Sequence, residues 1–326
     1  YRSLRRFNDA IRTAYGVAPG DIRRVAEAQT GGTIRLRLGY RPPFDFSRIL
    51  AYLASRAIPG VERVDAKSYA RSFAAGGAKG IVTVTQAARG HALEARIAVL
   101  EAGPRALPVR AIAARLRRLF DLDAEPGAIA GALSRDPLIG PRLERAAGLR
   151  VPGAFDGFEL AVRAVLGQQI SVKGATTIAG RIAAKFGEEI AGGEDGIGRI
   201  FPAAKVLARA DLSGLGLTGG RIATLRGLGA AVASGALDFT PRESLEAKIA
   251  ELTALPGIGE WTAHYISLRA LGEPDAFPAS DLGLRKAAGL HKAEGGGTPV
   301  SAAELETMSQ AWRPWRGYAA LALWTI

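Results

Sequence analysis

Cysteine is missing from this sequence of 326 residues. Disulfides are therefore excluded, as are zinc sites and iron–sulfur clusters that need cysteine ligands. Histidine is nearly as scarce, and the three residues, His91, His264 and His291, are scattered along the chain. Their spacing does not suggest a metal site.

Long apolar runs are also missing. Hydrophobic residues make up 48% of the chain, which is a globular composition, but no stretch reaches the roughly 18 apolar residues of a membrane-spanning helix. No apolar run follows Tyr1-Arg2-Ser3-Leu4-Arg5-Arg6, so no signal peptide is visible. A chain of this length can hold two domains and bury a sizeable core, and we expect a cytoplasmic protein.

Acidic residues are in deficit, with 31 Asp and Glu against 43 Lys and Arg and a net charge of +12. Such a balance fits a polyanionic partner, of which nucleic acid is the usual one. A second explanation is compositional, because an excess of Arg over Lys beside abundant Ala and Gly is also what a GC-rich genome imposes. Charge alone therefore favours a nucleic acid without deciding the matter.

Residues 29–104 alternate between apolar and polar side chains. Ile34–Tyr40 and Leu93–Val99 have this period of two, and Ile81–Thr85 is typical of a strand. Between them, Ser47–Ala57 has the spacing of a helix, with Ile49, Leu50 and Leu53 inward. The fold class that we predict is α+β: a small antiparallel-sheet domain at residues 29–104, then a mostly helical domain at 105–326.

A glycine-rich hairpin stands in the second half of the helical part. We expect a helix that has Thr240 as its cap and Pro241 at its first position, and that ends at Pro256. Gly257 and Gly259 then allow a tight turn before the next helix. Glycines this close to a helix N-terminus leave backbone N–H groups bare, and such groups bind anions, phosphate above all.

The hairpin and the residues after it resemble a known motif. Leu255-Pro256-Gly257-Ile258-Gly259-Glu260-Trp261-Thr262-Ala263, with Pro278 and Asp281 further on, is similar to the helix–hairpin–helix motif of base-excision DNA glycosylases. The most similar family is DNA-3-methyladenine glycosylase II (AlkA). The resemblance spans roughly residues 33 to 326, through Arg41–Phe46, Ser68–Arg71, Val151–Asp156, Leu166–Val172 and Trp312–Tyr318.

The resemblance implies a function. Such an enzyme flips damaged bases out of duplex DNA and hydrolyses the N-glycosidic bond of alkylated bases, 3-methyladenine and related alkylpurines. The implied partner is double-stranded DNA that contains alkylated bases, bound by a monomer associated with the nucleoid of a bacterial-type cell.

The chemistry explains which residue types such a site needs. A base alkylated at a ring nitrogen is cationic and stacks well on indole and phenol rings. The resemblance assigns these rings to Tyr52, Trp261, Tyr265 and Trp324. Positive charge develops on the sugar in the transition state, and a fixed carboxylate stabilises it and orients water. The resemblance gives this role to Asp281.

Structural explanations compete with each of these assignments. Asp281 can cap the helix that follows it, although a cap would also fix the carboxylate. The aromatic residues can belong to the core, which is how we interpret Trp315. Asp275 and Glu260 are weaker candidates for the carboxylate, because both look like solvated charges.

The resemblance also implies DNA contacts. Gly257, Gly259 and Thr262 are the expected phosphate contacts. The segment after Gly167 supplies the side chain that fills the gap left by the flipped base. The family's wedge is a Leu at the position of Gln169, so here Gln169 or Ile170 must fill that gap. The adjacent Gln168 is either a further DNA contact or a structural amide in a turn.

No cofactor is expected to be required. The resemblance implies only a monovalent cation, sodium or potassium, held by the main-chain carbonyls of Thr253, Leu255 and Ile258. Glycosylases that also nick the strand use a Lys two residues after the second hairpin glycine as nucleophile. Trp261 stands there, so we expect a monofunctional enzyme with water as nucleophile.

Residues 1–28 resemble a different family. Ser3, Phe7-Asn8, Tyr15-Gly16, Pro19 and Arg23 are similar to the end of the second helix-turn-helix of AraC-type regulators. The chain would then be part of a longer Ada–AlkA fusion; an ordinary N-terminal helix is the alternative. Two rival functions stay open, a glycosylase for another lesion such as oxidised guanine, and a DNA-binding regulator of the Ada response with a non-catalytic glycosylase body.

Overall fold

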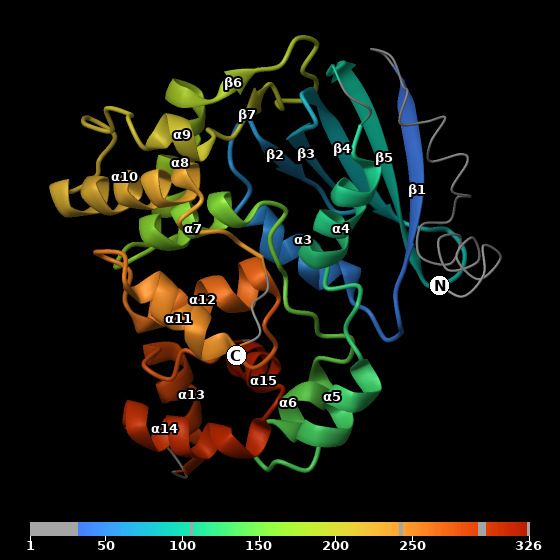
Figure 1. The fold of residues 1–326 in the computed structure, drawn as a ribbon. Coiled ribbons are helices and arrows are strands. Elements are labelled where there is room, and N and C mark those ends of the chain that lie inside the picture. The colour runs from blue at the N-terminus through green and yellow to red at the C-terminus, as the bar shows by residue number, and fades with distance from the viewer. Residues whose placement is uncertain (1–31, 105–106, 241–243, 293–297, 325–326) are drawn as a thin grey trace, which may run out of the picture.

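The computed structural model of the protein describes residues 32–104, 107–240, 244–292 and 298–324. Within them, an antiparallel sheet comes first and helices follow, so the predicted α+β class is confirmed (Figure 1). The segment 1–28, where we expect the end of a helix-turn-helix, lies outside these residues. No helix in the described ranges is long and apolar enough to cross a bilayer.

The sheet has five strands in the order β1-β5-β4-β3-β2, with every neighbouring pair antiparallel. The strands are β1 (Thr33–Gly39), β2 (Glu62–Val64), β3 (Ser68–Ala75), β4 (Ala78–Gln86) and β5 (Ala92–Glu101). On β1, Ile34, Leu36 and Leu38 are buried, whereas the two arginines between them are exposed. This alternation confirms the period of two, because one face of the sheet covers a core and the other meets water.

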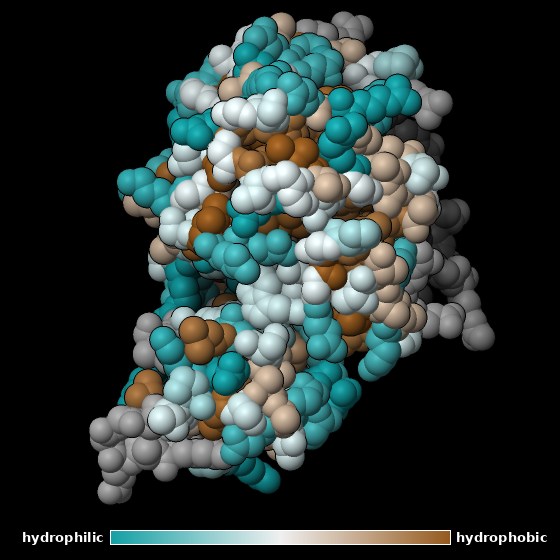
Figure 2. All heavy atoms as spheres, turned by 90° about the vertical axis from the view of Figure 1, so that its left-hand side faces the viewer, coloured by the Kyte–Doolittle hydropathy of each residue, from teal (hydrophilic) through white to brown (hydrophobic). Residues whose placement is uncertain are grey.

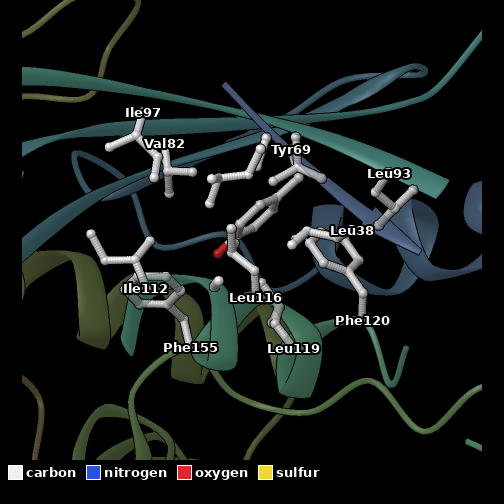
Figure 3. Packing of buried hydrophobic residues seen from close by; sticks show 14 of the residues in the cluster. Leu38, Tyr69, Val82, Leu93, Ile97, Ile112, Leu116, Leu119, Phe120 and Phe155 are labelled. Carbon is white, nitrogen blue, oxygen red and sulfur yellow. The ribbon is translucent and has the colours of Figure 1, made fainter. Parts of the chain in front are cut away.

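Two helices cover the buried face of the sheet (Figure 1). On α3 (Phe46–Ala54), Ile49, Leu50 and Leu53 are buried as predicted. The second helix, α4 (Val109–Leu119), contributes Ile112 and Leu116, which point toward the side chains of the sheet (Figure 3). The sheet's core therefore continues past residue 104, and the domain boundary that we place there stays a prediction.

The remaining helices form two further cores. The first is built mainly from α7 (Gly157–Leu166), α8 (Val172–Phe186), α9 (Ala204–Leu207), α10 (Gly219–Ser234), α11 (Leu245–Thr253), α12 (Glu260–Ile266) and a π-helix, η1 (Ser267–Leu271). The second is built mainly from α5 (Pro126–Leu133), α6 (Gly140–Arg145), α13 (Leu282–Lys292), α14 (Ala302–Ser309), a 3₁₀ turn, η2 (Gln310–Trp312), and α15 (Arg316–Trp324). A two-stranded ribbon, β6 (Glu188–Glu189) with β7 (Arg199–Ile200), lies near the first. Hydrophobic and hydrophilic residues are interspersed on the side of the molecule that carries α10 and α11 (Figure 2).

The start of α11 corrects a prediction. The helix does not begin at Thr240 but at Leu245, and Ser244 is its cap, accepting from the amide of Ala247 at 3.3 Å. Thr240 instead donates both its backbone N–H and its hydroxyl to the carboxylate of Asp238. This local Asp turn competes with the capping geometry and delays the helix.

Candidate active site

The hairpin between α11 and α12 is a tight turn that depends on Gly257. Its φ of +86° is in the left-handed region, and a Cβ there would lie 1.9 Å from the hydroxyl oxygen of Thr224. Gly259, which caps α12, is different, because a Cβ on it would have no heavy atom within 4 Å. The turn is therefore packed against α10 at Gly257. At Gly259 it is open, which leaves room for a ligand to approach the backbone.

Asp281 lies where three helices meet. One carboxylate oxygen, Oδ1, accepts from the amide of Leu284 at 2.9 Å, which makes Asp281 the cap of α13. The indole of Trp324, on α15, donates to the same oxygen at 3.0 Å, and the indole of Trp261, on α12, donates to Oδ2 at 2.8 Å. An ionised carboxylate only accepts hydrogen bonds, and all three partners are N–H donors. Capping and a fixed carboxylate are thus combined in one residue.

The aromatic residues form a continuous wall beside this carboxylate. The rings of Trp261 and Tyr265 are stacked, with centroids 5.3 Å apart and planes 8° from parallel. The hydroxyl of Tyr265 lies 3.2 Å from that of Tyr52, which comes from α3 of the sheet domain. Residues 52, 261, 265, 281 and 324 are therefore brought together from both halves of the chain.

Two arginines that the sequence analysis did not single out flank Tyr52. The guanidinium carbon of Arg56 lies 3.8 Å from the Tyr52 ring centre, and that of Arg269 lies 4.5 Å from it. Burial raises the pKa of Tyr52 to about 12. Burial is the largest single effect on the pKa of Tyr265 and acts to raise it, but the charges of Arg269, Arg56 and Arg163 and the hydrogen bond with Tyr52 together lower that pKa. A signal existed in the sequence, because each arginine follows its tyrosine by four residues, the spacing of one helix face.

The wall, the carboxylate and the arginines line one cavity of about 560 Å³ between the sheet domain and the helices. Other carboxylates reach the cavity but have different partners. Glu62 and Glu159 are buried in ion pairs, Glu62 with Arg163 at 3.1 Å and Glu159 with Arg71 at 2.6 Å. Asp45 and Asp156 cap α3 and α7. Among the described lining residues, Asp281 is the carboxylate held by indole groups.

The two weaker candidates for the carboxylate lie elsewhere. Asp275 pairs with Arg313 at 2.8 Å and with Arg316 at 2.9 Å. Glu260 is exposed at the start of α12. Neither lines the cavity.

The turn between α7 and α8 lies against the hairpin. The amide nitrogen of Gln168 donates to the carbonyl of Gly257 at 3.0 Å and to the hydroxyl of Thr262 at 3.1 Å. Thr262 is only 3% exposed. The next residue, Gln169, is exposed with a φ of +58°, and Ile170 is 37% exposed and lines the cavity. The turn therefore presents Gln169 and Ile170 to solvent while Gln168 binds inward.

The residues predicted to hold a cation are at the same hairpin. Thr253 is the last residue of α11, and Leu255 and Ile258 lie in the turn that follows. The carbonyl of Leu255 accepts from the amide of Ile258 at 3.1 Å. In the described part of the chain, no group of three or more His, Asp or Glu residues could hold a metal ion.

Several known proteins are similar to this chain in sequence or in fold. Residues 35–156 match the model of the AlkA N-terminal domain. A probable bifunctional transcriptional activator/DNA repair enzyme AlkA of Mycobacterium tuberculosis is 39% identical over 331 aligned residues, which cover 100% of this chain but 64% of that protein. DNA-3-methyladenine glycosylase 2 of Escherichia coli is 36% identical over 290 residues, covering 88% of this chain and 95% of that protein. A 3-methyladenine DNA-glycosylase from Archaeoglobus fulgidus shares the fold, with a TM-score of 0.70 and 20% identity over 88% of this chain and 96% of the other.

Proposed function

Because this chain belongs to the DNA-3-methyladenine glycosylase 2 (AlkA) family, we propose that it is a monofunctional DNA glycosylase. It hydrolyses the N-glycosidic bond of alkylated bases, 3-methyladenine and related alkylpurines, in duplex DNA. The observation that carries the proposal is the Asp281 carboxylate, fixed by two indoles at the edge of an aromatic cavity.

The cavity offers both parts of the reaction. A flipped cationic base stacks on the exposed ring surface of the wall formed by Trp261 and Tyr265. Since a cationic base is already a good leaving group, little acid catalysis is needed. Asp281 stabilises the positive charge that develops on the sugar and orients the attacking water. Trp261 stands where a strand-nicking enzyme would carry its Lys nucleophile, so no Schiff base forms.

The surface around the cavity would hold the DNA. The exposed side of the hairpin, at Gly257 and Gly259, binds a phosphate. Thr262, which is 3% exposed, supports this side through its hydrogen bond with Gln168. Gln169 or Ile170 fills the gap that the flipped base leaves, and Gln168 fixes their turn against the hairpin. One molecule carries the whole cavity, so we propose a monomer, acting on chromosomal DNA in the bacterial cytoplasm.

A monovalent cation fits the hairpin. Carbonyls at the end of a helix lack intrahelical partners and carry partial negative charge, and Thr253, Leu255 and Ile258 lie at the end of α11 and in the turn after it. We propose that their carbonyls hold sodium or potassium. When bound, the ion would supply positive charge beside a DNA phosphate.

The alternative is a DNA-binding regulator whose glycosylase body is not catalytic. It draws on the Mycobacterium tuberculosis relative, whose name includes transcriptional activator and whose aligned region covers the whole of this chain. This alternative predicts DNA binding without base release. A glycosylase for oxidised guanine is less favoured, because the cavity wall is aromatic and Trp261 replaces the Lys.

Base release from methylated duplex DNA tests the proposal. Wild type is compared with Asp281→Asn and with Asp211→Asn, which changes an exposed carboxylate that does not line the cavity. We expect wild type and the Asp211 variant to release 3-methyladenine, and the Asp281 variant to bind DNA but to release none. Binding without release by wild type would favour the regulator. Full activity of the Asp281 variant would place the catalytic carboxylate elsewhere.

A further inference from the structure

His264 lies on α12, one turn after Trp261, but does not line the cavity. Its Nδ1 accepts from the backbone amide of Phe277 at 3.2 Å. Phe277 is 1% exposed, and its ring packs edge-on against Trp312 at 5.7 Å. The histidine therefore holds a buried point of the backbone that comes just before Asp281.

The segment from Phe277 to Asp281 is a compact turn. The carbonyl of Phe277 accepts from the amide of Ala279 at 3.1 Å, and that of Pro278 accepts from the amide of Asp281 at 2.9 Å. The turn is thus held at its start by His264 and at its end by Trp261, which binds the Asp281 carboxylate. Both anchors belong to α12, so their spacing is fixed by one helix.

We propose that His264 is a positioning residue for Asp281. Its unprotonated Nδ1 holds the Phe277 amide, and through the turn it sets where the carboxylate lies relative to Trp261 and the cavity. This inference rests on the proposed function, because it assigns a role in placing the proposed catalytic group.

The hydrogen bond depends on the protonation of His264. An imidazolium ion donates from both nitrogens and cannot accept. Burial, the largest effect, lowers the pKa of His264 below its usual value, and Arg316 of α15 lowers it further; Glu260 on α12, Glu306 on α14 and Asp275 oppose this. The acceptor is therefore present at neutral pH, and it is lost only under acidic conditions.

Two variants of equal size separate positioning from packing. In His264→Asn, the amide oxygen takes the place of Nδ1 and does not titrate. In His264→Leu, the acceptor is lost. With alkylated duplex DNA under single-turnover conditions at pH 7.5, we expect the Leu variant to lose about 10- to 100-fold in rate, because small misplacements of a catalytic group are costly. Its DNA affinity should be unchanged, and the Asn variant should retain most of the wild-type rate.

The pH profile gives the second readout. Between pH 7.5 and pH 5 the wild-type rate should fall more than that of the Asn variant. Three results would each overturn the proposal. The first is a Leu variant as fast as wild type. The second is an Asn variant no faster than the Leu variant when circular dichroism shows that both are folded, and the third is parallel pH profiles for wild type and the Asn variant. If the Leu variant does not fold, the comparison of wild type with Asn still decides it.

A measurement on the free protein separates this inference from the proposed function. The ¹H–¹⁵N resonance of the Phe277 amide is followed from pH 8 to pH 5 in wild type and in His264→Asn. A shift in wild type that is missing from the Asn variant supports the hydrogen bond even if no base is released, and then it is the glycosylase function that fails. Identical titrations in the two proteins would overturn the role of His264 whatever the activity.

Discussion

Asp281 shows most directly how single contacts set up the proposed site. It has three donors, and each comes from a different place: the amide of its own helix, Trp261 and Trp324. The side chain has therefore little freedom to rotate away from the cavity. Such preorganisation is where a stabilising charge gains most of its effect.

Removing one indole donor should slow the reaction without removing the aromatic wall. In Trp261→Phe the ring can still stack on Tyr265, but the bond to Asp281 Oδ2 is lost. Hydrogen bonds to charged groups contribute about 1.5–3 kcal/mol, so the single-turnover rate of base release should fall about 10- to 100-fold. Trp315→Phe is the matched control, because Trp315 does not line the cavity, and it should keep the wild-type rate. Equal rates for the two variants would contradict a role for the indole N–H.

The sequence alone identified the residues that carry a motif and missed those that act through partners far along the chain. Asp281, Trp261, Tyr265, Trp324 and Tyr52 do line one cavity, although their catalytic and binding roles stay predictions. The spacing of His264 from the other histidines excludes a metal site and gives it no other role. Its partner is a backbone amide thirteen positions away, and no side-chain pattern marks a bond to a backbone amide.

At the scale of elements, periodicity predicted β1, β4, β5 and α3, because one face of each is buried, but it did not predict β2 and β3. The ends of helices were harder to predict. Helix α11 begins at Leu245 and not at Thr240, because Thr240 donates to the Asp238 carboxylate in a local turn. The sequence also did not predict that α4 packs against the sheet. An amphipathic pattern shows that a helix has a buried face, but it does not show which element covers that face.

The two hairpin glycines should respond differently to substitution. Gly257→Ala forces a side chain into the left-handed region and onto Thr224, and we expect it to lower the free energy of unfolding by about 1–3 kcal/mol. Gly259→Ala has normal backbone angles and open space, so only the weaker capping by alanine remains, and the loss should be at most about 1 kcal/mol. Denaturant unfolding measures both. Equal losses for the two variants would show that the contact with α10 does not hold the turn.

At the scale of the whole molecule, the cavity lies between the sheet domain and the helices, and buried ion pairs join the two. In its lining, Arg71 of β3 pairs with Glu159 of α7 at 2.6 Å, and Arg163 of α7 pairs with Glu62 of β2 at 3.1 Å. Buried pairs of this kind cost much to break when one partner is removed. They join α7 to the sheet domain, which supplies Tyr52 to the cavity.

A second junction, at Asp121, ties α4 to α15, the helix that carries Trp324. One oxygen of Asp121, Oδ2, accepts from the hydroxyl of Tyr318 at 2.8 Å and from the amide of Val151 at 3.0 Å. Burial raises the pKa of Asp121 to about 6 from 3.8, against the lowering effect of these two bonds and of Arg150. The folded protein therefore binds this proton more tightly than the unfolded chain does.

The sign of the resulting pH dependence follows from that difference. A carboxyl whose pKa is raised on folding destabilises the folded protein once it is ionised. The free energy of unfolding therefore falls as the pH rises from about 4 to about 6. Above pH 6 the loss stays constant, at up to about 3 kcal/mol. Asp121→Asn keeps an oxygen for both donors but carries no charge. The variant should unfold at a higher denaturant concentration than wild type at pH 8, and the difference should shrink toward pH 5.

Asp211→Asn is the control, because the pKa of this exposed carboxyl is lowered by its bonds to Ser213 and it stays ionised between pH 5 and pH 8. A difference between wild type and Asp121→Asn that is the same at both pH values would show that the Asp121 junction does not hold a proton.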